Sequence, residues 1–408
     1  MYIRVSESRF YPFHALAAHV LGFVGETKED SHHKGRYGIE SFYNDELAGK
    51  RDDLTSRFSR LTEGSDVVLT IDRNIQSVVE EILEKLISDY RATSGTVIVA
   101  DPKTGAILAL GSAPDFDPND YSSFSVSRFL NPAVESVYEP GSVFKLVTMA
   151  AGIDTGTVTP DTTYRDTGSL TLNGKTIKNW DEKSHGITTM TGVIENSLNI
   201  GAAFVESKIG HQVFLDYVNR FGVNEKTNVG LPGEVSGNTR SLEIDPRDIN
   251  FATASFGQGV AVTPLQLIRA VSVIANKGIM MQPYIRADVG PKQVRRVISE
   301  ETAKTITAMM VNAVDKNHVA HIPNYTVAGK TGTAQIPDFK HGGYTNEYVH
   351  TYVGFAPASD PRFIILVKID KPAHAPLAGT TVVPAFREIA EFLLNYYTVP
   401  PDNLPATQ

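Results

Sequence analysis

The sequence predicts an α+β domain built on an antiparallel sheet of about five strands, with helices flanking the sheet. Two short apolar runs joined by a tight turn occupy residues 95–110, and three further strand-like runs occupy 325–335, 351–356 and 362–369. A long block with mostly helical patterns separates the two groups. This order does not give consecutive β–α–β units, so we expect the first and last parts of the chain to pair in one antiparallel sheet.

The composition excludes several classes of protein. The 408 residues are 41% hydrophobic and 21% charged, carry a net charge of −8 and contain no cysteine. The lack of cysteine excludes disulfides, thiolate zinc sites and a thiol nucleophile. A net negative charge without a basic stripe gives no reason to expect nucleic-acid binding. No apolar run approaches the ~18 residues of a membrane span, and the first residues lack a signal-peptide pattern. The sequence leaves open a cytoplasmic protein or one whose targeting or anchoring segment has been removed.

The N-terminal part of the chain predicts little regular structure before a first long helix. Residues 1–65 are polar, with one short apolar patch at 16–25, and indicate an ordered linker or part of a small subdomain. Residues 67–72 read as a short strand that ends in Asp72, a good helix cap. A helix over about 74–90 follows, because its apolar residues recur on one face.

The rest of the chain divides into a hairpin, a mostly helical block and a return to strands. The hairpin joins 95–100 to 106–110, and a Pro-, Asn- and Asp-rich segment at 112–141 follows it. A small β-rich insert is expected near 164–178. Apolar periodicity predicts helices at about 189–209, 211–221, 264–276 and 300–316, and a closing helix over 384–397 with Pro384 near its first position.

Ser142 opens the stretch that carries the strongest chemical signal. Pro140 and Gly141 break the preceding structure, and apolar residues at helical spacing follow. Ser142 then lies in a first helical turn, where free N–H groups favour negative charge. Lys145 is three residues later and shares its face of the helix. A serine needs a base to become a nucleophile, and a lysine kept neutral by burial can provide one.

Two further patches combine polar groups with structured context. Ser197 and Asn199 interrupt a helical stretch, where a hydroxyl can relay a proton and an amide can hold a carbonyl. Lys330 and Gly332 fall on one face of a predicted strand, with Thr331 and Thr333 on the other. A glycine within a strand often marks the close approach of a ligand or another backbone.

Each of the three short patterns occurs twice in the chain. The second copies lie in polar loops or a turn: Ser31 with Lys34, Ser236 with Asn238, and Lys103 with Gly105. Neither copy is decisive by its motif alone. The copies at Ser142, Ser197 and Lys330 lie in apolar, structured elements and occur in this order, so we favour these as the functional set.

In type, order and spacing, the favoured set resembles the Ser-x-x-Lys, Ser-x-Asn and Lys-Thr-Gly motifs of serine β-lactamases and penicillin-binding proteins. Leu198 stands where class A β-lactamases have Asp. The resemblance is strongest to class B, monofunctional penicillin-binding proteins and runs from about residue 9 to 397. Trp180 and the turn at 256–259 look closer to division-type than to elongation-type members. The stretches that carry the wider match are 35–40, 69–72, 139–142, 260–266 and 329–335.

This resemblance implies a D,D-transpeptidase that uses no metal or cofactor. Ser142 would attack the penultimate D-Ala carbonyl of a stem pentapeptide and release the terminal D-Ala, with Lys145 as base. Ser197, helped by Lys330, would relay the proton to the leaving amine. Asn199 would orient the substrate amide.

The strand residues are assigned to substrate binding by the same resemblance. The hydroxyls of Thr331 and Thr333 would meet the carboxylate of a stem peptide or β-lactam. Backbone N–H groups of Ser142 and Thr333 would hold the oxyanion. Gly332 is expected to let a peptide lie close to the strand, so that a Val there would fit the fold but block the site.

The resemblance also implies organisation, location and partners. Residues 1–65 would be the end of an N-terminal non-catalytic module, 66–398 the transpeptidase domain and 399–408 a flexible tail. The expected partners are peptidoglycan stem peptides, β-lactams, a membrane glycosyltransferase and division proteins, with no nucleic acid. The domain would lie on the extracytoplasmic face of the cytoplasmic membrane, held by an N-terminal anchor that this sequence does not contain.

Several alternatives share some of these features. A serine β-lactamase, a D,D-carboxypeptidase or a β-lactam sensor has the same motifs, and Glu234 is the one candidate for the deacylating Glu of class A lactamases. A non-catalytic cell-wall scaffold is disfavoured by the intact motifs. A Ser-His-Asp hydrolase is disfavoured because the chain has no Gly-x-Ser-x-Gly elbow.

Overall fold

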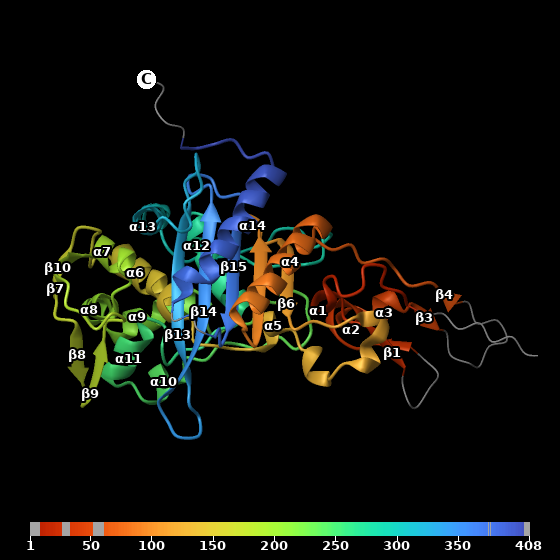
Figure 1. The fold of residues 1–408 in the computed structure, drawn as a ribbon, viewed down its shortest axis with the longest axis horizontal. Helices are drawn as coiled ribbons and strands as arrows, with labels where there is room; N and C mark the ends of the chain where they lie inside the picture. The colour runs from red at the N-terminus through yellow and green to blue at the C-terminus, as the bar shows by residue number, and fades with distance from the viewer. Residues whose placement is uncertain (1–8, 27–32, 52–60, 374, 376, 404–408) are drawn as a thin grey trace, which may run out of the picture.

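The computed structural model describes residues 9–26, 33–51, 61–373, 375 and 377–403 (Figure 1). The central sheet has five antiparallel strands in the order β13-β14-β15-β5-β6. The N-terminal hairpin supplies two of them and the C-terminal region three, and β15 pairs with β5 so that Leu366 lies opposite Ile98. The predicted fold class and strand pairing are therefore confirmed. The strands are β5 (Ser94–Ala100), β6 (Ile107–Ala113), β13 (Ala328–Pro337), β14 (Tyr344–Ala356) and β15 (Phe363–Asp370).

Helices cover both faces of the sheet, and the strands divide their apolar side chains between them. Val97 and Val99 pack with α4 (Arg73–Tyr90) and α14 (Val382–Tyr396), whereas the intervening Ile98 packs with the residues of α6 (Lys145–Asp154) and α12 (Pro264–Ala275). This alternation follows from the two-residue period of a strand. It gives the domain two apolar layers, with α6 buried on the second face.

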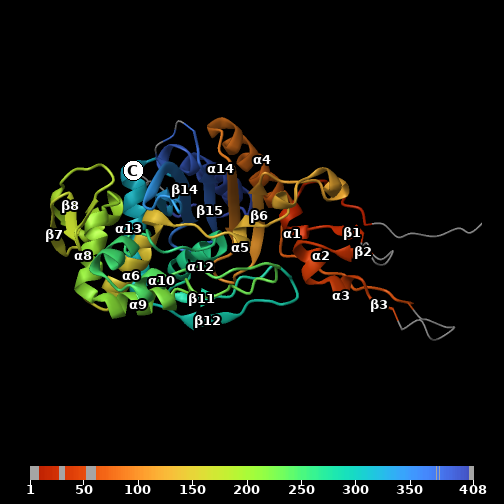
Figure 2. The same ribbon diagram turned by 90° about the horizontal axis from the view of Figure 1, so that it is seen from below.

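The helical block lies beyond the β13 edge of the sheet, and the N-terminal residues lie beyond the β6 edge (Figures 1 and 2). The block contains helices α7 (Met190–Glu195), α8 (Asn199–Ile209), α9 (His211–Arg220), α10 (Arg240–Ile244), α11 (Asp248–Ala254) and α13 (Glu300–Asn317). The same part of the chain forms three two-stranded sheets, β7 with β10, β8 with β9 and β11 with β12. The strands are β7 (Thr163–Asp166), β8 (Ser169–Leu172), β9 (Lys175–Lys178), β10 (Gly186–Thr189), β11 (Ile279–Met281) and β12 (Gln293–Arg296).

The N-terminal residues pack on the β6 side through an aromatic cluster and an ion pair. Phe23 stacks on Tyr121 at 4.3 Å between ring centroids, and Phe116 and Phe129 complete the cluster. Arg286 donates two hydrogen bonds to Glu46, at 2.6 and 2.9 Å. The N-terminal elements are β1 (Val24–Glu26), β2 (His33–Gly35), β3 (Lys50–Arg51), β4 (Leu61–Thr62), α1 (Ala18–Leu21), α2 (Gly38–Phe42) and α3 (Asn44–Leu47).

Short helices punctuate the connecting segments. The approach to Ser142 contains η1 (Pro118–Ser123), η2 (Val126–Arg128) and α5 (Pro132–Glu135), and η4 (Ala378–Thr380) precedes α14. Within the described residues, no helix combines the length and apolar character needed to cross a membrane.

Several boundary predictions differ from the structure, and the strand predicted over 351–356 already begins at Tyr344. The strand predicted at 67–72 is only an isolated bridge between Leu69 and Arg286, although Asp72 caps α4 as predicted. The helix predicted over 189–209 is two helices, α7 and α8, divided at Ser197. The last helix begins at Val382, two residues before Pro384, because a proline is tolerated within the first turn.

The end of the chain is also more ordered than predicted. The backbone N–H of Thr326 donates to Asp402 at 2.8 Å, and the Tyr325 hydroxyl donates to the carbonyl of Val399 at 2.6 Å. Residues 399–403 therefore contact the domain, and any tail begins within 404–408, which lie outside the described residues.

Candidate active site

Ser142 lies in a short 3-10 helix, η3 (Gly141–Phe144), that leads directly into α6. Gly141 has a φ of +55°, and its N–H donates to the Gly257 carbonyl at 3.1 Å. A Cβ on Gly141 would lie 3.2 Å from the carbonyl oxygen of Thr333. Only glycine combines this backbone conformation with such close packing. The turn therefore places Ser142 directly beside the edge strand β13.

Lys145 joins the first two predicted motifs through its amine. Its Nζ lies 2.9 Å from Ser142 Oγ, 2.6 Å from the Ser197 carbonyl oxygen and 2.8 Å from Asn199 Oδ1. The last two atoms only accept hydrogen bonds, so they take the two N–H groups of a neutral amine. A charged amine donates to Ser142 Oγ, whereas in the neutral form the lone pair is left for the Ser142 hydroxyl to donate to. This is the arrangement that a general base requires.

The surroundings of Lys145 favour its neutral form. The residue is 1% exposed. Burial, and then the charge of Lys330, hold the pKa of Lys145 well below its usual range. A charged amine costs free energy when it leaves water, and a second cation nearby adds repulsion. Lys145 is therefore suited to receive a proton at neutral pH.

Ser197 lies at the junction of α7 and α8, with an unusual φ of +55°. Its hydroxyl is 2.9 Å from Lys330 Nζ and 3.3 Å from Lys145 Nζ. Burial lowers the pKa of Lys330 to about 7. The Ser197 hydroxyl thus bridges two amines, and a strained backbone turn holds it there.

Asn199 is the first residue of α8, and both ends of its amide are held. Its Oδ1 accepts from Lys145, and its Nδ2 donates to the Lys178 carbonyl at 2.8 Å. Trp180 donates from Nε1 to the Asn196 carbonyl at 2.9 Å. The β-rich insert therefore supports the second motif, a contact that the sequence did not indicate because it is formed by backbone carbonyls.

Glu139 also supports the Ser142 turn, and sequence reasoning did not select it. Its carboxylate accepts from the Gly259 N–H at 2.9 Å and from the Tyr344 hydroxyl at 3.3 Å. Burial raises the pKa of Glu139 to about 7. This side chain links the nucleophile's turn to the 256–259 turn and to the start of β14.

The third motif lies on β13, at the edge of the sheet, as predicted for a strand that could receive an extended peptide. Lys330 and Gly332 are buried and Thr331 and Thr333 are half-buried, in agreement with the predicted alternation. The Thr333 hydroxyl accepts from the Ala378 N–H at 3.2 Å. The Thr331 hydroxyl lies 3.5 Å from Lys330 Nζ.

The predicted reason for Gly332 needs correction. A Cβ at this position would lie 2.7 Å from the Pro140 carbonyl oxygen and 3.1 Å from Val143 Cγ2. The missing side chain makes room for the turn that carries Ser142, not for the open side of the strand. A close approach of two backbones explains a glycine within a strand as well as a ligand does, and sequence alone does not separate the two.

Gly332→Val is therefore expected to lower both stability and acylation. The branched side chain would push β13 and the Ser142 turn apart, so we expect a lower melting temperature and a loss of about 10²-fold or more in β-lactam acylation of the folded protein. Melting temperature and acylation rate, measured on the same preparation, test this.

The matched control is Gly105→Val in the second Lys-Thr-Gly copy. Gly105 has a φ of +87°, and a Cβ there would lie 2.4 Å from the Gln282 carbonyl oxygen. This change should lower stability while the folded fraction still acylates normally. Normal acylation by Gly332→Val would instead remove this strand from the site.

The remaining candidates lie elsewhere. Glu234 accepts from the backbone N–H groups of Thr227 and Asn228 and so organises its own loop, which gives no support to a deacylating role. Lys103 pairs with Asp360 at 2.5 Å, and Asn238 bridges to Ala261. Ser31 lies outside the described residues.

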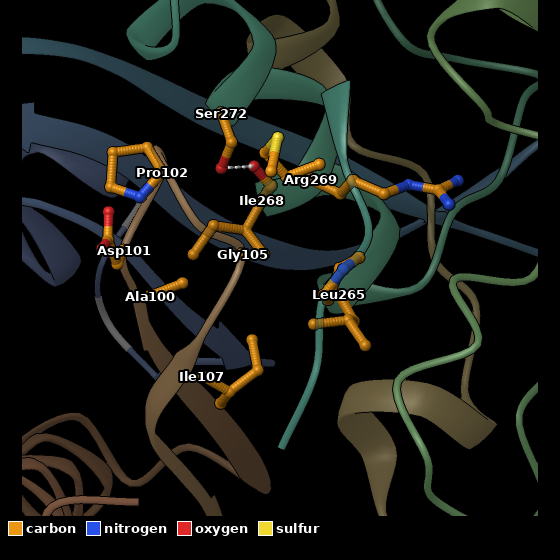
Figure 3. A pocket seen from close by; sticks show the side chains of 11 residues that line it. Ala100, Asp101, Pro102, Gly105, Ile107, Leu265, Ile268, Arg269 and Ser272 are labelled. Carbon is orange, nitrogen blue, oxygen red and sulfur yellow. Dashed lines mark hydrogen bonds between the residues drawn. The ribbon is translucent and has the colours of Figure 1, made fainter. Parts of the chain in front are cut away.

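A small pocket between the β5–β6 turn and α12 is separate from this site (Figure 3). Its volume is about 20 Å³, close to the space that one water needs. Ser272 donates to the Ile268 carbonyl at 2.7 Å in its wall. None of the residues of the motif copies at Ser142, Ser197 and Lys330 lines the pocket, so we assign no substrate to it.

Comparisons with known proteins agree with the fold and show the family. Residues 95–391 match the penicillin binding protein transpeptidase domain, and residues 1–63 match the penicillin-binding protein dimerisation domain. Stage V sporulation protein D of Bacillus subtilis is 35% identical over 94% of this chain and 63% of its own length. Peptidoglycan D,D-transpeptidase FtsI of Escherichia coli is 31% identical over 99% of this chain and 70% of its own. The chain thus spans less than two thirds of the B. subtilis relative.

A solved structure gives the same result. Penicillin binding protein 3 of Mycobacterium tuberculosis, complexed with aztreonam, superposes with a TM-score of 0.85 at 32% identity and covers 98% of this chain and 93% of its own. A serine–lysine site on this sheet defines an acyl-transferring class of protein, and the chain belongs to the penicillin-binding protein transpeptidase family. Its relatives place it among the class B members of the FtsI and PBP3 type.

Proposed function

We propose that this chain is a peptidoglycan D,D-transpeptidase that β-lactams acylate at Ser142. The observation that carries the proposal is the contact of 2.9 Å between Ser142 Oγ and the Nζ of Lys145, whose pKa burial and the charge of Lys330 hold well below its usual range. A hydroxyl paired with a neutral amine can attack an acyl carbon at neutral pH. Relatives named peptidoglycan D,D-transpeptidase and a relative's complex with aztreonam support this reaction.

In the acylation step, Lys145 takes the Ser142 proton as Oγ attacks the penultimate D-Ala carbonyl. The backbone N–H groups of Ser142 and Thr333 receive the developing oxyanion. The proton passes through the Ser197 hydroxyl, beside Lys330, to the leaving nitrogen, and the terminal D-Ala departs. An ester on Ser142 remains.

In the second step, an amine of a neighbouring stem peptide attacks that ester. Lys145 removes the ammonium proton and returns a proton to Ser142 Oγ, so that an amide forms and the serine is restored. Asn199, Thr331 and Thr333 form the substrate-facing part of this proposal: Asn199 orients the peptide amide, and the strand binds the peptide and its carboxylate. Gly332 contributes by letting the Ser142 turn pack against this strand.

We extend the proposal to organisation and partners. Residues 1–65 form the end of a non-catalytic module and 66–398 the transpeptidase domain, which the matched ranges 1–63 and 95–391 support. Because peptidoglycan is built outside the cytoplasmic membrane, we place the domain on the extracytoplasmic face, held by an N-terminal anchor. A membrane glycosyltransferase and division proteins are the proposed partners, on the basis of the FtsI-type relatives.

Intact mass after incubation with penicillin tests the function. A stable adduct that maps to Ser142 supports an acyl-enzyme, and its lifetime separates a transpeptidase from a β-lactamase, whose adduct is hydrolysed rapidly. The absence of an adduct on folded protein would contradict the proposal.

The pH dependence of acylation is predicted to shift in Lys330→Ala. The charge of Lys330 lowers the pKa of Lys145, so its removal raises the pKa of Lys145. Only neutral Lys145 can accept the serine proton. The pH below which the acylation rate falls should therefore be higher in the variant than in the wild-type protein. A chromogenic cephalosporin gives the rate of each protein at each pH, and the melting temperature checks folding. A pH that is unchanged or lower in the variant would contradict the coupling.

A further inference from the structure

An open polar groove lies beside the approach to Ser142. Its volume is about 530 Å³, and one wall contains Glu135 and Val137 while the other runs from Val235 to Glu243. The Tyr138 N–H donates to the Val262 carbonyl at 3.0 Å, and the Asn238 N–H donates to the Ala261 carbonyl at 2.8 Å. The 261–262 segment therefore holds the two walls together.

The groove starts close to the nucleophile. Val137 precedes Ser142 by five residues, so the two are at most about 17 Å apart, at ~3.4 Å for each extended residue. The Ser241 hydroxyl donates to the Gly259 carbonyl at 2.7 Å, and Glu139 accepts from the Gly259 N–H. These contacts connect the far wall of the groove to the Ser142 turn.

A preformed hydrogen-bond network makes the floor. Thr239 is buried, and its hydroxyl donates to Glu243 Oε1 at 3.1 Å and accepts from Asn224 Nδ2 at 2.5 Å. Asn224 Nδ2 also lies 3.0 Å from Asn219 Oδ1. Because these polar groups satisfy one another, the floor keeps its shape without a ligand.

The walls carry polar side-chain groups that have no hydrogen-bond partner in the described part of the chain. The Ser236 hydroxyl, the Asn238 side-chain N–H₂ and the Arg240 guanidinium have no hydrogen bond or ion pair to any described residue. Two carboxylates, Glu135 and Glu243, add acceptors. A set of mixed donors and acceptors around an open groove suits a ligand that carries many hydroxyl and amide groups.

Small apolar side chains complete the lining. Val137 and Val235 lie among the polar groups. An acetylated amino sugar offers hydroxyls and amide N–H and C=O groups for the polar side chains and methyl groups for the valines. A peptide that adds to a sheet edge would instead need a free row of backbone groups, which the paired Asn238 N–H does not provide.

We propose that this groove binds the acetylated amino-sugar chain of peptidoglycan, an inference that rests on the proposed function. A four-residue stem peptide spans about 14 Å when extended, at ~3.4 Å for each residue. This length is comparable with the upper bound of ~17 Å on the distance from Val137, in the groove wall, to Ser142. A sugar in the groove can therefore carry a stem whose D-Ala carbonyl reaches Ser142 Oγ. Ser236 and Asn238, the second copy of the Ser-x-Asn pattern, thereby acquire a binding role.

The test compares two groove variants with a surface control. Ser236→Trp fills the groove from an exposed position, and Arg240→Ala removes its free cation. Arg247→Ala is the control, because Arg247 is an exposed arginine that pairs with Asp245 outside the groove. Three rates are measured: acylation by a cephalosporin, aminolysis of a small peptide thioester, and cross-linking of intact glycan strands.

The groove variants are expected to cross-link intact glycan at least about 10-fold more slowly than the control, while the cephalosporin and thioester rates stay within about twofold. The groove could bind the glycan strand of the acyl donor or that of the acyl acceptor. Reactions with a disaccharide pentapeptide as donor, or with a disaccharide tetrapeptide as acceptor, show which of the two strands the variants affect. Binding of an N-acetylglucosamine tetramer, followed by NMR, should weaken in both variants. If folded Ser236→Trp cross-links glycan and binds the tetramer normally, the groove holds only solvent and the inference is overturned. A wild-type protein that fails to acylate would instead contradict the proposed function.

Discussion

Ser142→Ala is expected to abolish covalent labelling by penicillin and to leave the fold intact. The variant loses the only atom that forms the ester, so no adduct should appear in the intact mass and the acylation rate should fall by about 10⁴-fold or more. Stability should change little, since the side chain is half-buried in a turn and loses one hydrogen bond, worth about 1 kcal/mol, to Lys145. Mass spectrometry and a thermal melt measure the two effects.

The second Ser-x-x-Lys copy supplies the control. Ser31→Ala should label at the wild-type rate, because the Ser142 copy, which contacts the second motif and through it the third, supplies the nucleophile. If Ser142→Ala still forms an adduct and Ser31→Ala does not, the assignment of the nucleophile is wrong.

The sheet was predictable because its signals are local and agree with one another. The apolar runs of β5 and β15 are long enough to be recognised, and their burial on both faces explains why they lack strict alternation. The segment at 67–72 has the same kind of composition, yet it forms only one bridge, between Leu69 and Arg286. It meets β6 through single hydrogen bonds from the Thr70 hydroxyl to the Ile107 carbonyl and from the Asp72 N–H to the Leu108 carbonyl. Pairing depends on a distant partner, which a local pattern does not reveal.

The site was predictable in its members but not in its contacts. The motif order selected Ser142, Lys145, Ser197 and Lys330, and the structure brings their polar atoms within 3.3 Å of a neighbour in the set. The left-handed backbone of Ser197 gave no signal, because serine is not a residue that usually marks this conformation. The Lys178 carbonyl, the acceptor for Asn199, gave no signal in the sequence either, because every residue has a backbone carbonyl.

The two lysines of the site have related environments but different expected roles. Lys145 touches Ser142, Ser197 and Asn199, whereas Lys330 contacts Ser197 and the backbone of Thr331. Lys145 alone is in direct contact with the nucleophile's hydroxyl. Loss of Lys330 should therefore slow acylation and shift its pH dependence, while loss of Lys145 should stop it.

Lys145→Ala is accordingly expected to remove acylation about as completely as Ser142→Ala, because a nucleophile and its base act as a unit. The truncation also leaves the Ser197 carbonyl and Asn199 Oδ1 without their donor, which costs about 1–3 kcal/mol for a fully buried group and less for these two half-buried residues. Lys145→Met keeps the apolar length of the side chain and separates this structural loss from the chemical one. Both variants should fail to form an adduct, and the Met variant should melt at the higher temperature of the two.

Two histidines are the alternative bases that this experiment excludes or identifies. His185 contacts Asp181 at 2.9 Å, and His211 stacks on Phe251 with ring centroids 4.0 Å apart. Neither histidine forms a hydrogen bond with Ser142, so neither should restore acylation in a protein that lacks Lys145. A near-normal acylation rate in folded Lys145→Met, which is lost on further change of His185 or His211, would transfer the role of base to that histidine. If the change of Lys145 alone abolishes acylation, Lys145 is the base that accepts the Ser142 proton.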